Sequence, residues 1–188
     1  MLANEFIVFD TETTGLVKAE SSRLSEQPQI IEFAAVKLDN EFNELDRITF
    51  LCNPGKPLPL KIIEITGLKD ADLKEQPPFV SNYPKLCEFF LGSRCLVAHN
   101  ISFDTNLLKF ELMRVDRVLR FPWPPVWIDT IERSMHFENR RLKLVELYKM
   151  ATGKEYPAHR AMADVEALIT VMKWMREKKD VKFAGESK

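Results

Sequence analysis

Asp10 and Glu12 are acidic residues separated by one position, directly after the apolar run 5–9, EFIVF. A short run of aromatic and β-branched residues predicts a buried strand, and residues i and i+2 of a strand point to the same face. The two carboxylates are then close, so their like charges raise one pKa unless a cation neutralises them. Hard oxygen ligands of this kind suit Mg²⁺ or Mn²⁺. Taken alone, the pair fits either a metal site or a carboxylate that caps the following turn.

Two further acidic residues lie at predicted helix starts. Asp104 follows the short buried-strand candidate 95–98 and lies two residues after Ser102, a predicted N-cap. Asp164 lies in the first turn of a helix predicted over 161–176, beside its apolar stripe rather than opposite it. Negative charge is favourable at a helix N-terminus, which explains Asp104 without any ligand. An aspartate that leans toward a core needs a partner, because burying an unpaired charge is expensive, and a metal ion is such a partner.

His159 stands five residues before Asp164, in the loop that precedes the last predicted helix. With an unperturbed pKa of about 6.5, its imidazole is well suited to accept a proton from water at neutral pH. The alternative is an ordinary exposed loop histidine. His99, at the end of a strand next to Asn100, and His136, within a helix, have weaker cases for a role in proton transfer.

The elements that must position these residues change character along the chain. The runs 30–38 and 47–52 predict two strands that form an antiparallel meander with the first strand. After residue 59, strand candidates alternate with helices. The strands are predicted over 95–98 and 126–128, and the helices over 79–91, 102–115, 142–151 and 161–176, with one more beginning at Thr130. This order predicts an α/β fold with a mixed sheet, the three-stranded antiparallel meander being followed by parallel strands, and helices on both faces.

Length and composition narrow the possible classes of protein. The chain has 188 residues, which indicates one domain over 1–176, and the polar stretch 177–188 predicts a frayed tail. Its 27 Lys and Arg residues balance 28 Asp and Glu residues, giving a net charge of -1. A polycationic surface is thereby excluded, so nucleic-acid binding would need a local site or a metal ion. The segment 17–29 is rich in Ser, Glu and Gln and predicts an exposed loop.

The cysteine content and the hydropathy of the chain indicate the cellular compartment of the protein. Cys52, Cys87 and Cys95 are odd in number and show no C-x-x-C spacing, which argues against a disulfide framework or zinc knuckle and predicts reduced thiols. No apolar run approaches the roughly 20 residues that span a bilayer. The first residues do not have the pattern of a secretory signal. We therefore expect a cytoplasmic protein with no membrane partner.

Three segments, taken together, resemble the motifs of the DnaQ-like, DEDDh-type 3'-5' exonucleases of the ribonuclease H-like superfamily, which include the proofreading subunit of DNA polymerase III. The segments are Asp10-Thr11-Glu12-Thr13-Thr14-Gly15, His99-Asn100-Ile101-Ser102-Phe103-Asp104 and His159-Arg160-Ala161-Met162-Ala163-Asp164. Two more pieces resemble family segments, namely Ile65-Thr66-Gly67-Leu68 and Ile128-Asp129-Thr130. The five pieces occur in the family's order and cover roughly residues 6–174, which makes the resemblance far more specific than any one motif.

The resemblance implies a metal-dependent enzyme that releases nucleoside 5'-monophosphates from the 3' end of DNA, in proofreading or repair. It implies that Asp10, Glu12 and Asp164 hold one divalent ion, that Asp10 with Asp104 holds a second, and that His159 deprotonates the attacking water. The ions would be Mg²⁺ or Mn²⁺. Substrate contacts are expected from Thr11, Thr13, Thr14, Gly15, Thr66, Leu68, His99, Asn100 and Phe103. The expected partners are single-stranded nucleic acid or frayed 3' ends, together with a DNA polymerase.

Several alternatives stay open at this point. RNA 3'-end trimming is one, because no side chain can be assigned to the 2'-hydroxyl. A phosphatase of the haloacid dehalogenase type also begins with a strand and D-x-D-x-T, but here the second acid is Glu12 and no convincing downstream Lys and paired Asp follow. A non-catalytic binding module with a structural cation is the third, although such a module has no use for His159 as a base.

The apolar candidates for substrate contact also have structural alternatives. Phe103 and Leu68 fit core packing as well as contact with terminal bases. Trp123 and Trp127 lie in a Pro-rich segment, where they would either stack on single-stranded substrate or pin the loop to the core.

Overall fold

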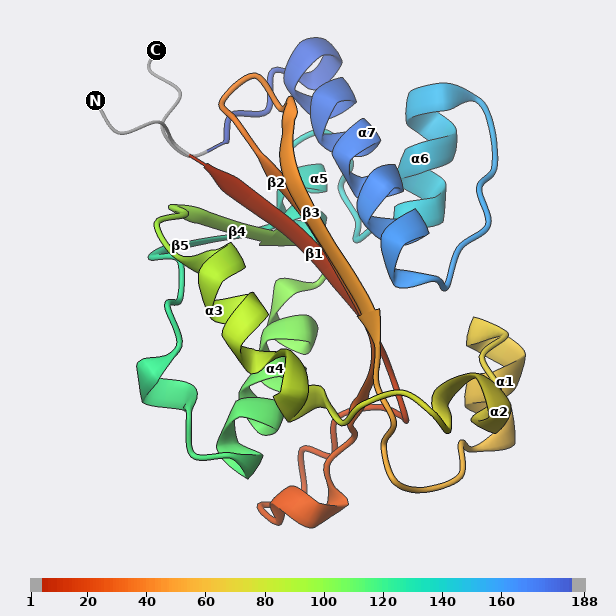
Figure 1. Ribbon diagram of the computed structural model, residues 1–188. Helices are drawn as coiled ribbons and strands as arrows, with labels where there is room; N and C mark the ends of the chain where they lie inside the picture. The colour runs from red at the N-terminus through yellow and green to blue at the C-terminus, as the bar shows by residue number, and fades with distance from the viewer. Residues whose placement is uncertain (1–4, 184–188) are drawn as a thin grey trace.

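A five-stranded mixed sheet organises the chain, which the computed structural model describes over residues 5–183 (Figure 1). The strands are β1 (Phe6–Thr13), β2 (Ile30–Leu38), β3 (Glu44–Leu51), β4 (Cys95–Ala98) and β5 (Val126–Asp129). They lie in the order β3-β2-β1-β4-β5. β2 pairs antiparallel with β1 and β3, whereas β4 pairs parallel with β1 and β5. The predicted α/β class, with an antiparallel meander followed by parallel strands, is confirmed.

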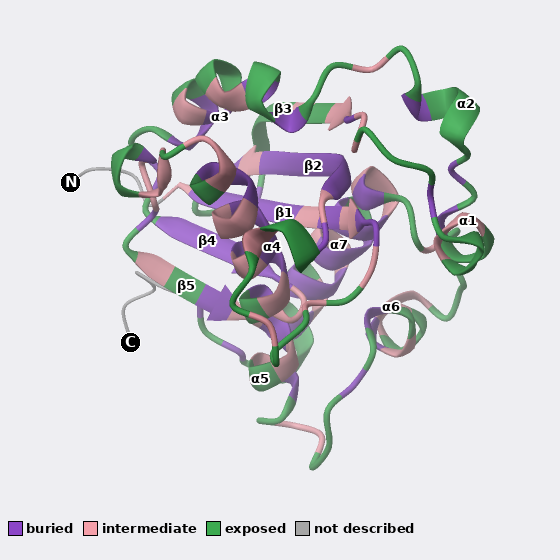
Figure 2. Ribbon diagram, turned by 90° about the horizontal axis from the view of Figure 1, so that it is seen from below, coloured by how far each residue is buried: buried purple, intermediate pink, exposed green. Residues whose placement is uncertain are grey.

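Helices cover both faces of this sheet. They are α1 (Leu60–Thr66), α2 (Asp70–Leu73), α3 (Tyr83–Phe90), α4 (Ile101–Arg114), α5 (Thr130–Ser134), α6 (Leu144–Thr152) and α7 (Ala161–Lys179). Three short 3-10 turns are η1 (Leu24–Glu26), η2 (Phe79–Asn82) and η3 (Val118–Arg120). Figure 1 shows α6 and α7 on one face and α3 and α4 on the other. Figure 2 shows the buried strands between these layers.

Alternation along β1 decides which residues meet which helix layer. Phe6 and Val8 pack in the apolar cluster that contains the buried face of α7, whereas Ile7 and Phe9 pack in the cluster built with α3 and α4. Since the side-chain period of a strand is two, Asp10 and Glu12 fall on the α7 face, and Thr11 falls on the α4 face. The apolar half of β1 thereby fixes the direction in which its acidic half points.

The first strand is longer than the predicted run 5–9, because it continues through the acidic motif to Thr13. Asp10, Thr11 and Glu12 pair in register with Ala34, Phe33 and Glu32 of β2. Pairing along the whole length of β2 thus overrides the weak strand propensity of acidic residues. A register irregularity lies between Glu12 and Thr13, just before the end of the strand.

The start of α4 also differs from the prediction, since Asn100 and not Ser102 is the N-cap. Asn100 has a left-handed backbone with φ 73°, a conformation that asparagine tolerates better than most residues. The helix consequently begins at Ile101. Asp104 still lies in its first turn, as predicted.

The other helix boundaries shift by a few residues for local reasons. The helix predicted over 79–91 divides into η2 and α3, because Pro84 fits only in the first turn of a helix. The segment 17–29 is mostly exposed, as predicted, and includes η1. The three cysteines are free thiols, with Cys52 and Cys95 buried and Cys87 half-buried. None of the helices within residues 5–183 is long and apolar enough to cross a membrane.

The predicted polar tail begins too early at residue 177. α7 continues to Lys179, and Val181 and Phe183 are buried in the same apolar cluster as the helix. The Phe183 ring meets the Phe42 ring edge to face at 5.2 Å. The Arg176 guanidinium lies over the same Phe42 ring, 4.0 Å from its centroid. The rest of the predicted tail, residues 184–188, lies outside the described residues.

We predict that Phe183→Ala lowers the free energy of unfolding by about 3 kcal/mol. This value is at the low end of the range for removing a buried aromatic ring, because the end of the chain can relax into the space. Urea unfolding followed by circular dichroism measures this change. Leu119→Ala is the control, because that side chain is fully exposed. Equal unfolding free energies for Phe183→Ala and wild type would contradict the packing of this segment.

Candidate active site

A cavity of about 560 Å³ opens where the C-terminal end of β1 meets α4, α6 and the start of α7. Nine predicted site residues line it, namely Asp10, Thr11, Glu12, His99, Asn100, Phe103, Asp104, His159 and Asp164. They come from three segments of the chain that lie far apart in sequence. The fold therefore gathers the three motifs around one space.

Asp104 is tied to β1 from the α4 side of the sheet. One of its carboxylate oxygens, Oδ1, accepts hydrogen bonds from the Thr11 backbone N–H at 3.1 Å and from the Thr11 hydroxyl at 2.7 Å. The Asp104 side chain is only 2% exposed. Both bonds from Thr11 use a single oxygen of this carboxylate.

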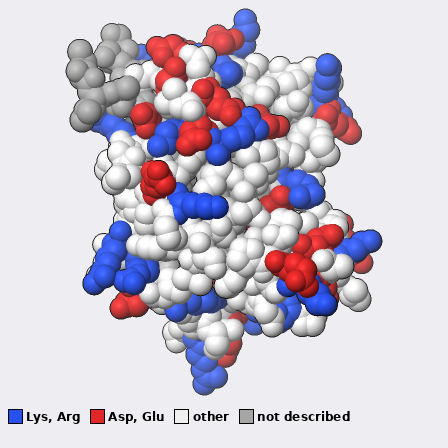
Figure 3. Space-filling view, viewed as in Figure 1, with Lys and Arg blue, Asp and Glu red and all other residues white. Residues whose placement is uncertain are grey.

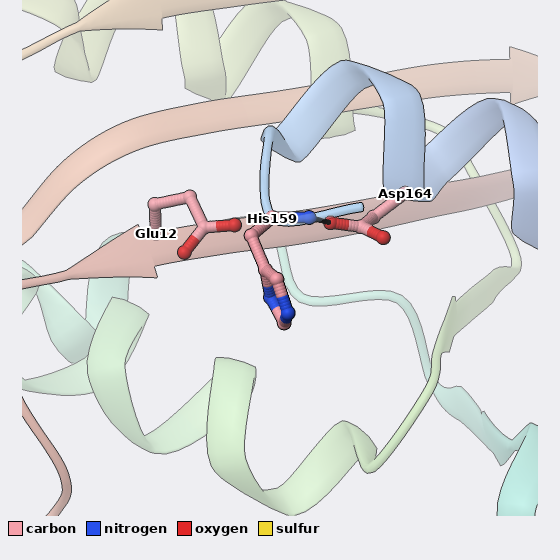
Figure 4. A group of neighbouring side chains, drawn as sticks. All are labelled: Glu12, His159 and Asp164. Carbon is pink, nitrogen blue, oxygen red and sulfur yellow. Dashed lines mark hydrogen bonds between the residues drawn. The ribbon is translucent and has the colours of Figure 1, made fainter. Parts of the chain in front are cut away.

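Asp164 is fixed from the opposite face. Its Oδ1 accepts a hydrogen bond from the Tyr156 hydroxyl at 2.5 Å, and its Oδ2 accepts one from the His159 backbone N–H at 2.8 Å. Figure 4 shows the second bond, with the His159 ring directed away from it and Glu12 approaching from β1. Glu12, His159 and Asp164 each offer a ligand atom, and these atoms lie within 4.8 Å of one another.

Burial and mutual repulsion make ionisation of this cluster costly. Burial raises the pKa of Asp10 well above that of an ordinary aspartate, and the charges of Asp104 and Asp164 raise it further. Burial, followed by the charges of Asp164 and Glu32, raises the pKa of Glu12 to about 8. The charges of the neighbouring acids thus oppose the ionisation of Asp10 and Glu12.

Hydrogen bonds offset part of this cost for the other two acids. Burial raises the pKa of Asp104 to about 7, although the hydrogen bonds from Thr11 oppose the shift. Burial also raises the pKa of Asp164, against the hydrogen bonds from Tyr156 and from the His159 backbone. Donors to carboxylate oxygens stabilise the charged form, but none of these donors carries a positive charge.

The donor set fits a divalent cation. Over residues 5–183, neither Asp10, Glu12, Asp104 nor Asp164 forms an ion pair with Lys or Arg. Buried charges in proteins are paired or coordinate metals. Carboxylate oxygens are the ligands that Mg²⁺ and Mn²⁺ favour.

Comparison with known proteins agrees with this geometry. Residues 7–172 match the family model described as Exonuclease, RNase_T. The chain belongs to this exonuclease family. The predicted class, a DEDDh-type 3'-5' exonuclease, is confirmed, and the phosphatase and binding-module alternatives are set aside.

Curated relatives of the exonuclease include much longer polymerases. It is 37% identical to the DNA polymerase III PolC-type of Halalkalibacterium halodurans over 171 residues, which are 89% of this chain and 11% of that protein. It is 32% identical to the DNA polymerase III PolC-type of Caldanaerobacter subterraneus over 179 residues, 94% of this chain and 12% of that protein. The chain thus spans about one eighth of these relatives' length.

Solved structures share its fold at low sequence identity. The zinc-bound E. coli ExoI–ssDNA complex has a TM-score of 0.75 at 20% identity, covering 94% of this chain and 41% of that one. Exonuclease X in complex with 5' overhanging duplex DNA has a TM-score of 0.62 at 21% identity, covering 93% of both chains. These likenesses agree with the predicted ribonuclease H-like fold.

A second hydrogen-bonded group orients the turn before α4 in the exonuclease. The Asp129 carboxylate accepts from the Asn100 backbone N–H at 3.1 Å and caps α5 by accepting from the Ile131 N–H at 2.9 Å. His99 Nδ1 lies 3.0 Å from the Thr130 hydroxyl. Burial lowers the pKa of His99, which favours the neutral ring. The Asp129-Thr130 pair therefore positions the turn that carries His99 and Asn100.

Several predicted substrate residues do not line this cavity among the residues described. Thr13 and Thr14 are buried, with Thr13 donating to the Gly15 carbonyl and Thr14 accepting from the Gln29 N–H. They stabilise the turn at Gly15, and substrate contact by this turn stays a prediction.

The residues around Gly67 likewise make contacts within their own segment. The Thr66 hydroxyl donates to the Ile62 carbonyl and accepts from the Leu68 N–H. Leu68 is 4% exposed and packs in an apolar cluster that also contains Ile31 and Leu73. The structure favours core packing for Leu68, whereas Phe103 is half-buried and lines the cavity.

The tryptophans lie away from the cavity lining. Trp123 packs against the Phe121 ring at 4.8 Å and donates to the Val118 carbonyl at 3.2 Å. Trp127 is 40% exposed, its ring is tilted by 49° from that of Trp123, and it donates to the Pro124 carbonyl at 2.9 Å. This arrangement favours, for Trp123, the alternative in which the tryptophan fixes the Pro-rich loop to the core.

Sequence reasoning missed several residues in or beside the site, among them Tyr156 and Glu32. Tyr156 lines the cavity and donates to Asp164, but a tyrosine in a loop gives no signal of its own. Glu32 lies directly opposite Glu12 in the register of β1 and β2 and is 4% exposed. The sequence did contain an indication for Glu32, because it is the one acidic residue inside the largely apolar run IIEFAAVKL.

The raised pKa values predict how stability depends on pH without metal. Groups whose folded pKa exceeds the unfolded value, about 4 for a carboxyl, contribute stability that is lost as pH rises through the folded pKa. For Asp104 and Glu12 these folded pKa values are about 7 and about 8. We therefore expect the melting temperature in EDTA to fall steadily from pH 5 to about pH 8.

Mn²⁺ should abolish most of this fall, because a bound cation stabilises the ionised carboxylates. Calorimetric or fluorescence melting at several pH values, with EDTA or Mn²⁺, gives both profiles. Glu12→Gln should make the fall in the EDTA profile shallower, whereas Asp46→Asn, on the exposed strand β3, should leave it unchanged. A flat profile for wild type in EDTA would show that the cluster is ionised without metal.

Proposed function

We propose that this exonuclease removes nucleoside 5'-monophosphates from 3' ends of single-stranded DNA, using two divalent ions, Mg²⁺ or Mn²⁺. The observation that carries the proposal is the convergence of Asp10, Glu12, Asp104 and Asp164 on one cavity without a basic partner inside the described chain. Such a cluster of carboxylates is tolerated only with protons or cations to neutralise it.

The roles of the carboxylates follow from their placement. Asp10, Glu12 and Asp164 face the α7 side of the cavity and would hold one ion, while Asp10 and Asp104 would hold the other. Two such ions supply positive charge to both the attacking and the leaving oxygen of a phosphodiester displacement. Thr11, Tyr156 and the His159 N–H keep the carboxylates of Asp104 and Asp164 in fixed orientations.

His159 is proposed as the general base. Its side chain is exposed toward the cavity, so its ring is accessible to water. Its backbone N–H is held by Asp164, which fixes the base relative to a carboxylate of the cluster. An imidazole at this place takes a proton from the attacking water in one step of the hydrolysis.

The cavity also has features suited to a nucleic-acid end. Phe103 lines it with a half-buried ring, and a ring of this kind provides a stacking surface for a base. Arg141 and Lys143 line the side formed by the start of α6 and are exposed, within reach of backbone phosphates. Figure 3 shows acidic and basic side chains interspersed over the viewed face, so that attraction would be local.

Relatives support DNA as the substrate and a polymerase as the context. Those described above are polymerases named for DNA, and ExoI was solved with single-stranded DNA. We therefore propose frayed or single-stranded DNA ends as substrate and a DNA polymerase as partner, in proofreading or repair. The alternative, RNA 3'-end trimming, is tested by comparing the cleavage of DNA and RNA oligonucleotides.

We predict that Asp10→Ala, Asp104→Ala and Asp164→Ala each reduce kcat by more than about 100-fold. This loss exceeds the roughly 10- to 100-fold that is typical when a residue hydrogen-bonded to a metal ligand is removed. Each change removes a cation ligand but also a repelling charge, so the fold should remain intact. The assay follows 5'-labelled single-stranded DNA and RNA oligonucleotides with Mg²⁺, Mn²⁺ or EDTA.

Wild type should shorten DNA from the 3' end only with metal, and Asp46→Asn should match wild type, because this aspartate lies on the exposed strand β3. Faster cleavage of RNA would replace the DNA assignment. Retained activity of any two of the three alanine variants, at saturating metal, would contradict the proposed ion ligands.

His159→Ala should lower kcat by about 10²- to 10⁴-fold, the usual contribution of a general base. Mn²⁺ affinity, measured by calorimetric titration, should change little, because the four carboxylates remain. His136→Ala, a histidine outside the cavity lining, is the matched control. A large loss of Mn²⁺ affinity in His159→Ala would instead assign this histidine as a metal ligand.

A further inference from the structure

Glu32 is a buried carboxylate that the proposed hydrolysis does not use. It lies on β2, opposite Glu12, and is 4% exposed. Its Oε1 accepts from Arg160 Nη2 at 2.9 Å, and its Oε2 accepts from Arg160 Nε at 3.0 Å. The guanidinium therefore binds the carboxylate through two parallel bonds, the geometry that gives arginine pairs their directional strength.

The same carboxylate also replaces a missing helix cap. Arg160 is the N-cap residue of α7, and its side chain makes no capping hydrogen bond. Glu32 Oε2 instead accepts from the backbone N–H of Ala161, the first residue of the helix, at 3.3 Å. A strand residue thus supplies the acceptor that the first turn of a helix requires.

His159 lies directly before this anchored residue and has a left-handed backbone with φ 68°. Side chains other than glycine adopt that conformation only where surrounding contacts hold it. Two contacts do so here. The His159 N–H is bound by Asp164 on one side, and Arg160 is clamped to Glu32 on the other.

We propose that Arg160 and Glu32 form a positioning pair that holds the backbone of His159 so that its ring faces the carboxylate cluster. Neither residue lines the cavity, so the pair acts through His159. This inference rests on the proposed role of His159 as the base.

The test measures kcat and KM for DNA in the steady state, with excess substrate, for Arg160→Gln in wild type and in the His159→Ala background. Arg160→Gln should lower kcat by about 10- to 100-fold in wild type, as for other residues that orient a catalytic group, with KM for DNA little changed. In the His159→Ala background it should lower kcat by less than about threefold, because residues that act through one another are not additive.

Charge and geometry are separated by two more variants. Arg160→Lys keeps the charge but cannot make both bonds, so its kcat should lie between those of wild type and Arg160→Gln. Glu32→Gln combined with Arg160→Gln removes both charges and leaves no unpaired buried carboxylate. This double variant should be more active than Arg160→Gln alone.

Arg47→Gln is the matched control, because Arg47 also binds a glutamate through two bonds, to Glu44 at 2.6 Å, but on the exposed strand β3. It should leave kcat unchanged. The chain has only 3 histidines, so the imidazole NMR signals are readily assigned. The His159 signal of the metal-free protein should move in Arg160→Gln and not in Arg47→Gln.

Equal fold-losses in the wild-type and His159→Ala backgrounds would overturn the proposal, as would an unchanged kcat or His159 signal in Arg160→Gln. If Arg160→Gln does not fold, as shown by its melting curve, Arg160→Lys carries the same comparison. Asp10→Ala, assayed in parallel, separates this proposal from the function. Activity that survives in Asp10→Ala contradicts the proposed active site itself, whereas its loss confines any failure to the positioning pair.

Discussion

The constraint on which this structure depends is the repulsion among carboxylates placed at the end of a buried strand. Asp10 and Glu12 point to one face of β1, and Asp104 and Asp164 reach the same cavity from two helices. Burial and mutual repulsion both disfavour their ionised forms. A fold without a use for this arrangement would replace it with apolar side chains, which would be at least as stable.

The surrounding contacts hold these carboxylates in place without neutralising their charge. Thr11 and Tyr156 donate neutral hydrogen bonds to Asp104 and Asp164, which fixes their orientation but leaves their charge. Arg160, the residue after His159, is directed to Glu32 instead. The charge of the cluster is thereby preserved for a cation, and the positions of its oxygens are set before any cation binds.

Much of this could be predicted from the sequence because the signals were local. The limits of β2 and β4 follow from their largely apolar runs, and the three motifs marked the carboxylates and His159. What could not be predicted depends on pairing between distant segments. The extension of β1 through Glu12 requires β2 beside it, and the burial of Val181 and Phe183 requires the Phe42 ring. Glu32 and Tyr156 acquire their roles only when α7 packs on the sheet.

The central claim is that the cluster holds protons when metal is absent and loses them when a divalent cation binds. Calorimetric titration of the metal-free protein with Mn²⁺ at pH 7, in two buffers of different ionisation enthalpy, counts the protons released. With the pKa of Glu12 about 8 and that of Asp104 about 7, we expect binding to release at least about half a proton per protein. Mn²⁺ binding without proton release, or no binding at all, would contradict the account.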